Sequence, residues 1–186
     1  MDCTRCNSKS CRTSATRCAA TKCDIYSIIE TYHEPKNQAI VQAAAQLVDN
    51  GRAGTLGRLE ELAEYSKHMN YTRIGLAYCW GMEVLAAQVR DYFSSHGFHV
   101  VPVSCTVGAL SQAEVNETSS LQGVSCNPLS QAEQLNNENI DIALSMGLCV
   151  GHDILFNEKI QVPVTTILVK DRVYNNNPIA FLERTK

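Results

Sequence analysis

Residues 73–79 read Arg-Ile-Gly-Leu-Ala-Tyr-Cys, and residues 98–104 read Phe-His-Val-Val-Pro-Val-Ser. Both are short apolar runs, which predicts two buried strands. Residues 82–95 carry apolar side chains at helical spacing and stop before Gly97, which predicts a helix between the strands. Such a βαβ unit pairs its strands in parallel through a right-handed crossover. Because Pro102 cannot donate to a sheet ladder, we expect the second strand to lie at the edge of the sheet or to end early.

The same pattern continues toward the C-terminus. The polar residues 106–125 predict a loop, and Asn127-Pro128 supply a preferred N-cap and first helical residue for a helix that reaches about residue 137. Residues 140–148 and 162–169 predict a third and a fourth strand. We therefore expect an α/β fold: an open, mainly parallel sheet of about four strands with helices on both faces, Rossmann-like in arrangement.

Two further helices are predicted before the first strand. Pro35 suits the first turn of a helix that ends near Gly51, and a second helix is expected over about residues 56–68. We expect both to cover the sheet. The chain is thus divided into a cysteine-rich metal-binding or cluster-binding segment, residues 1–24, and an α/β domain with a cysteine-lined crevice, residues 25–186.

Composition narrows the classes of partner. The formal net charge of the 186-residue chain is −3 and its pI is near 5.9, so no basic field attracts nucleic acid. No apolar run approaches the roughly 20 residues of a membrane helix, and the N-terminus lacks a signal-peptide pattern. We therefore expect a cytoplasmic protein without nucleic-acid or membrane partners. In a reducing compartment, its nine cysteines are predicted to be metal ligands or reactive thiols.

Five of the cysteines lie within the first 23 residues, with hardly an apolar side chain among them. Such a segment cannot build a core, so it is either disordered or ordered by what its thiolates bind. In the run Cys3-x2-Cys6-x4-Cys11, a tight turn can present two thiolates to one ion, and later cysteines can complete a set of four. We predict Cys23 as the fourth ligand and Cys18 as the spare thiol. Zinc would make the segment a folding knuckle, whereas a [4Fe-4S] cluster would make it an electron relay.

The other four cysteines map to one edge of the predicted sheet, beyond the carboxyl ends of its strands, where open parallel sheets bind ligands. Cys79, Cys105 and Cys149 end the first three strands, and Cys126 precedes a helix N-terminus that favours thiolates. A single cysteine in such a place is as often a small buried hydrophobe. Four at one edge predict a metal or iron-sulfur centre held by Cys105, Cys126 and Cys149, with Cys79 as fourth ligand or neighbouring thiol.

Residues 147–153 read Gly-Leu-Cys-Val-Gly-His-Asp, and the two glycines are expected to let the backbone turn tightly toward a bound group. His152 is interpreted as a ligand, a proton donor or a hydrogen-bonded loop residue. We select His152 and Asp153 as candidate catalytic residues. Lys170, Asp171 and Arg172 follow the fourth strand, where they could bind an anion or form a solvated charged turn.

Several short runs in the C-terminal third of the chain resemble the pattern of a known family. These runs are Cys126-Asn127-Pro128 with Gln131-Ala132 and Asn136, Gly147 to Asp153, Leu155-Phe156, Pro163 to Thr166, Lys170 to Val173, and Asn177-Pro178. Tyr78-Cys79, Gly97-Phe98, Cys105-x-Val107-Gly108 and the opening Cys3-x2-Cys6-x4-Cys11-Arg12 look similar too. These runs resemble the DUF1847 family of uncharacterised cysteine-rich metal-binding proteins of bacteria and archaea. The resemblance implies metal or iron-sulfur binding, often in anaerobes, and no settled reaction. The chain departs from the family pattern at Asp24, at Thr106, where a lysine is common, and at Asn175-Asn176.

Three functions follow from these patterns. The leading hypothesis is a protein with one or two [4Fe-4S] clusters. If only three cysteines bind, an open iron site would allow redox, Lewis-acid or desulfidase-like sulfur-transfer chemistry on a small sulfur-containing or anionic substrate, with an electron donor as partner. The second is a non-enzymatic zinc protein with a structural knuckle and an α/β binding domain. The third is a thiol redox sensor. A homodimer is a further expectation.

Overall fold

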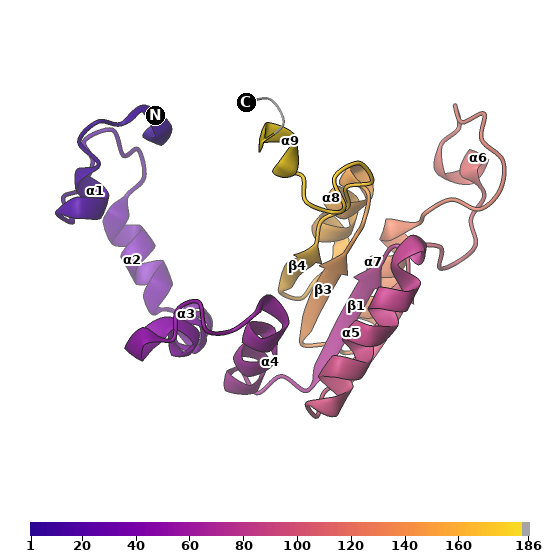
Figure 1. Ribbon diagram of the computed structural model, residues 1–186, viewed down its shortest axis with the longest axis horizontal. Helices are drawn as coiled ribbons and strands as arrows, with labels where there is room; N and C mark the ends of the chain where they lie inside the picture. The colour runs from indigo at the N-terminus through magenta and orange to yellow at the C-terminus, as the bar shows by residue number, and fades with distance from the viewer. Residues whose placement is uncertain (184–186) are drawn as a thin grey trace. The chain divides into compact units, whose positions relative to one another are not determined.

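The structure of the protein, a computed structural model, describes residues 1–183 and divides the chain into two compact units, Met1–Ala45 and Gln46–Lys186 (Figure 1). No helix in the described part of the chain is long and apolar enough to cross a bilayer. The predicted change of composition after residue 24 falls inside the first unit, where Asp24 caps the first long helix.

The first unit consists of short helical segments with little buried apolar surface. Its elements are η1 (Cys3–Arg5), α1 (Ser10–Thr13), α2 (Ile25–His33) and most of α3 (Pro35–Val48). The Asp24 carboxylate accepts a hydrogen bond from the Tyr26 backbone N–H at 3.0 Å, which satisfies one free donor at the start of α2. Ala43 is the one buried residue that α2 and α3 contribute, so tertiary packing stabilises these helices weakly.

The second unit carries the sheet. Its elements, in chain order, are η2 (Asp49–Gly51), α4 (Arg58–His68), β1 (Arg73–Tyr78), η3 (Trp80–Met82), α5 (Glu83–Ser95), β2 (His99–Ser104), α6 (Gln112–Val115), α7 (Pro128–Asn136), β3 (Ile142–Met146), α8 (Val150–Lys159), β4 (Val164–Leu168) and α9 (Ala180–Glu183). Each of the four predicted strands is present within its expected range.

The four strands form one open sheet in the order β2-β1-β3-β4, and every pairing is parallel. This confirms the predicted Rossmann-like α/β fold. Pro102 lies opposite Leu76 in β2, and β2 is an edge strand, so the missing N–H of proline breaks no inner ladder. From β1 the chain moves outward to β2 and then returns past β1 to β3. The direction therefore reverses between β1 and β3, which is the switch point where ligands bind in such sheets.

Helices cover both faces of the sheet, as predicted, because residues alternate between the faces along each strand. On one face, Ile74 and Leu76 of β1 pack with residues of α4 and α5, and Figure 1 shows α5 lying along the sheet. On the other face, Ala77 packs with residues of α7 and α8, including Leu135 and Phe156. Of the two helices expected to cover the sheet ahead of β1, α4 supplies Leu62 and Ala63 to this core, whereas most of α3 belongs to the first unit.

The segment after β3 corrects one sequence expectation. Gly147 turns tightly, with φ of +65°, and a Cβ atom there would stand 2.9 Å from Met82 Cγ, so glycine is required. Gly151 makes no such turn because it lies inside α8, a helix that the sequence analysis does not predict. The opening Val-Gly-His-Asp of α8 consists of weak helix formers, and burial of Phe156 against the sheet compensates for them.

We expect Phe156→Ala to lower the free energy of unfolding by about 3–5 kcal/mol, because the ring is completely buried and its removal leaves a cavity between α8 and the sheet. Leu155→Ala is the matched control, since the adjacent Leu155 is exposed and should cost less than about 1 kcal/mol. Urea denaturation measures both. Equal losses would contradict the assignment of Phe156 to the core.

Candidate metal centre

The parallel register brings Cys79 and Cys105 to the same level of the sheet. Tyr78 pairs with Ser104 at the ends of β1 and β2, and the next backbone N–H, that of Cys105, donates to the Tyr78 carbonyl at 2.9 Å. Each cysteine is therefore the first residue beyond its strand. Both are almost completely buried, so their thiols are shielded from solvent.

Cys126 joins this pair although the loop of residues 106–125 separates it from Cys105. The Asn127 backbone N–H donates to the Cys105 carbonyl at 2.6 Å, and the Asn127 side-chain amide donates to the Val107 carbonyl at 3.2 Å. As a result, the Cys105 and Cys126 sulfur atoms lie 3.5 Å apart. The Asn127 carbonyl oxygen of the side chain also accepts from the Ser130 N–H, which caps α7.

Gln131 of α7 contacts the same edge of the sheet. Its side chain is completely buried, and its Nε2 donates to the carbonyls of Tyr78 at 3.1 Å and Val103 at 2.7 Å. This amide thus clamps the ends of β1 and β2 next to the thiols. The sequence analysis gives Gln131 no role at the site. The sequence signal for this role is a glutamine on the otherwise apolar face of α7, because a buried amide is expected to have hydrogen-bond partners.

Lys170 supplies a positive charge to the thiol group. Its Nζ lies 2.6 Å from Cys79 Sγ, and because β3 stands between β1 and β4, the side chain spans the end of β3. Burial raises the pKa of Cys79, but the hydrogen bond and charge of Lys170 outweigh it, so the pKa lies below the usual value of a thiol. The sequence analysis assigns Lys170 to a bound anion or a charged turn, and the group that it contacts here is the Cys79 sulfur.

Cys105 has the opposite preference. Burial raises its pKa to about 12, although the Trp80 backbone N–H favours the thiolate by donating to the sulfur at 3.3 Å. The surroundings therefore favour the thiolate form at Cys79 and the neutral thiol at Cys105. A thiophilic cation would remove this difference, because metal ligation requires deprotonated sulfur.

Cys149 lies at the same edge but has a different partner. It is the half-buried N-cap residue of α8, and its sulfur lies 3.9 Å from Arg172 Nη2. Of the four predicted ligands, Cys105 thus interacts with both Cys79 and Cys126, whereas Cys149 is associated with the second cation, Arg172.

His152 and Asp153, the candidate catalytic residues, lie in the first turns of α8. Burial and then the charge of Lys170 lower the pKa of His152, which favours the neutral imidazole. The Asp153 carboxylate accepts a hydrogen bond from the Ser145 hydroxyl at 2.6 Å, which ties α8 to β3. Asp153 therefore positions the helix whose first residues carry Cys149 and His152.

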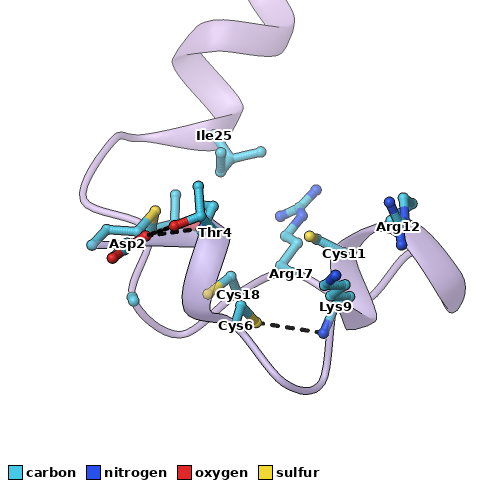
Figure 2. A pocket seen from close by; sticks show the side chains of 13 residues that line it. Asp2, Thr4, Cys6, Lys9, Cys11, Arg12, Arg17, Cys18 and Ile25 are labelled. Carbon is cyan, nitrogen blue, oxygen red and sulfur yellow. Dashed lines mark hydrogen bonds between the residues drawn. The ribbon is translucent and has the colours of Figure 1, made fainter. Parts of the chain in front are cut away.

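The N-terminal cysteines lie in the first unit. Four of them, Cys3, Cys6, Cys11 and Cys18, line a pocket of about 620 Å³ (Figure 2). Cys23, the predicted fourth ligand, is exposed and is not among the residues that line this pocket.

Neither set of cysteines forms a complete coordination shell. Within residues 1–183, no group of three or more His, Cys, Asp or Glu side chains is arranged to hold a metal ion. A guest at either place would draw the sulfur atoms inward, as expected where binding and local ordering are coupled.

The protein thus belongs to the class of open, all-parallel α/β sheets, with buried thiols just beyond the carboxyl ends of β1 and β2. The chain belongs to the DUF1847 family, whose description is "Protein of unknown function (DUF1847)" and which matches residues 16–167. This confirms the resemblance seen in the sequence. The chain is also 37% identical over 181 residues to an uncharacterized protein of Methanocaldococcus jannaschii, an alignment that covers 95% of this chain and 91% of that protein.

In metal-free protein, we expect Lys170→Gln to raise the pKa of Cys79, because the ammonium group that stabilises its thiolate is lost. The thiolate would then form at higher pH than in the natural chain. The shift is measured by titrating the ultraviolet absorbance of the thiolate. In each background, the difference between the chain with Cys79 and the chain with Cys79→Ser isolates the signal of Cys79. Lys159→Gln is the matched control, since Lys159 pairs with Glu133 at 2.9 Å. An unchanged titration in Lys170→Gln would show that the contact does not form in solution.

Proposed function

We propose that this chain is a metal-binding protein that holds a thiophilic metal centre, iron-sulfur or zinc, at the carboxyl edge of the sheet. Cys79, Cys105 and Cys126 are the ligands, and Cys149 is the candidate for the fourth position. The observation that carries this proposal is the 3.5 Å separation of the Cys105 and Cys126 sulfur atoms, which belong to segments that meet at the carboxyl ends of β1 and β2.

The sulfur separation fits two thiolates that share one ion. Thiolates about 2.3 Å from a tetrahedral ion stand about 3.8 Å apart, whereas a disulfide would bring the sulfur atoms to about 2.05 Å. In a [4Fe-4S] cluster each cysteine binds a separate iron, so such a cluster at this edge would require Cys105 and Cys126 to move apart. Zinc, or an iron that both thiols share, requires no such separation.

The surrounding charges fit a thiolate centre. A metal held by several thiolates carries negative charge, and the Lys170 ammonium stands 2.6 Å from one of the sulfur atoms. The N-terminus of α7 follows Cys126 directly, where the positive end of the helix dipole stabilises anions. The buried setting of Cys79 and Cys105 excludes water and strengthens these interactions.

When bound, the centre supplies either Lewis acidity at an open coordination position or an electron-transfer site. The chain's own residues then define two sides of the edge. The Lys170 ammonium lies beside Cys79 Sγ, and His152 lies near Lys170, so this side stabilises negative charge on the centre. On the other side, Arg172 accompanies Cys149 and presents a cation to an anionic or sulfur-containing substrate.

A thiol redox sensor is the second candidate, and the same 3.5 Å separation favours it. Oxidation of Cys105 and Cys126 to a disulfide would release two protons and pass two electrons to an oxidant such as a peroxide. Thiol titration before and after peroxide treatment distinguishes this function, because it requires a loss of two thiols with no metal in either state.

Strictly anaerobic purification followed by iron, zinc and acid-labile sulfide analysis tests the metal proposal. We expect bound metal in the natural chain, and we expect Cys105→Ser and Cys126→Ser each to lower metal content by the amount held at the edge, because two ligands of one ion are not replaceable by hydroxyls. Ser104→Ala is the control, since Ser104 precedes Cys105 but is outside the thiol group.

Each result has a distinct meaning. Iron with sulfide indicates a cluster, and zinc without sulfide indicates the non-enzymatic alternative. Retention of metal in Cys149→Ser would leave one position open for substrate, whereas its loss would indicate a closed four-cysteine centre. Metal content that is unchanged in both Cys105→Ser and Cys126→Ser would refute the proposed centre.

A further inference from the structure

The pocket in the first unit is a second site with a chemistry of its own. Figure 2 shows Cys6, Cys11 and Cys18 around this pocket, which is lined by four cysteines and has a volume of about 620 Å³. These cysteines come from η1, from α1 and from the loop that follows α1. Four thiols from separate turns therefore face a single space.

A polynuclear occupant suits the size and lining of the pocket. Four thiolates complete the ligand set of either a single tetrahedral ion or a cluster. The four cysteines here line a cavity of about 620 Å³, which has room for a cluster. Ligands spread around a space in this way suit a cluster in which each thiolate binds a different metal atom.

The charge of the lining indicates an anionic occupant. Lys9, Arg12 and Arg17 line the pocket, against a single carboxylate, that of Asp2. The Asp2 carboxylate is already engaged, because it accepts from the Thr4 N–H at 3.0 Å and pairs with Arg5 at 3.4 Å. Figure 2 shows Lys9, Arg12 and Arg17 gathered on the side of Cys11. Iron-sulfur clusters with four thiolate ligands are anions, and nearby cations stabilise them.

The backbone also donates to one of the thiols. Lys9 adopts a left-handed conformation, with φ of +47°, and its N–H points to Cys6 Sγ at 3.4 Å. A non-glycine residue in this region is strained unless its surroundings stabilise it. Backbone N–H groups that donate to cysteine sulfur are among the contacts by which proteins tune iron-sulfur clusters.

We propose that Cys3, Cys6, Cys11 and Cys18 bind a [4Fe-4S]-class cluster in this pocket, with Lys9, Arg12 and Arg17 balancing its charge. Cys18 replaces Cys23 as the fourth ligand, because Cys18 lines the pocket and Cys23 does not. The proposal is independent of the edge centre, since all four ligands lie within Met1–Ala45.

The test uses the full chain with Cys79→Ser, Cys105→Ser and Cys126→Ser, which removes the edge centre. After anaerobic treatment with ferrous iron and sulfide, this chain should retain about four irons and about four sulfides. Adding Cys18→Ser should remove most of this iron, whereas adding Cys23→Ser should leave it. Iron retained in the Cys18→Ser chain, or one zinc without sulfide in the parent, overturns the proposal.

Single variants of the natural chain keep the test decisive if the triple variant does not fold. Cys18→Ser should then hold about four irons fewer than Cys23→Ser, and equal iron contents overturn the proposal. Failure of the edge centre is recognised separately, because the triple variant would then hold as much metal as the natural chain.

The charge of the lining is tested by electrochemistry of the reconstituted chain. Arg17→Gln removes a cation beside the cluster and should shift its reduction potential to more negative values, because the reduced cluster carries more negative charge. Lys22→Gln is the control, since Lys22 is exposed and does not line the pocket. Equal potentials in the two variants would overturn the assigned role of Arg17.

Discussion

Parallel pairing of β1 with both of its neighbours is the constraint on which the edge site depends. Because β1 pairs with β2 and β3 in parallel, the three carboxyl ends meet on one side, and the residues that follow them must share a small volume. Cys79 and Cys105 are adjacent in register for this reason alone. An antiparallel partner would have carried its next residue to the opposite edge.

The pattern of the sequence is sufficient for the fold because each strand is a short apolar run and the connecting helices carry clear signals. Pro102 even indicates its own edge position, since proline is excluded from inner ladders. The prediction fails for α8, whose first residues are poor helix formers and whose stability depends on burial of Phe156. Such tertiary stabilisation is invisible to local propensity.

The sequence predicts that these cysteines lie at one edge of the sheet, but it does not predict the side chains that contact them. Topology places Cys79 and Cys105 together, and Cys126 follows from the helix start at Asn127. The approach of Lys170 to Cys79, in contrast, depends on a side chain that spans an intervening strand. The position of Gln131 likewise depends on which face of α7 meets the strand ends. In the N-terminal segment there is no periodicity to place Cys18 and Cys23, so spacing could not rank them.

The loop of residues 106–125 can change in length without disturbing the cysteines at the edge of the sheet. Its base is closed by a bridge between Ser111 and Val124 and by the Ser125 N–H, which donates to the Leu110 carbonyl at 2.8 Å. Cys105 and Cys126 lie outside this closure, so the tip can change length without displacing either sulfur, and the entropic cost of added residues grows only slowly. A reporter peptide can therefore be inserted at the tip without displacing the two thiols.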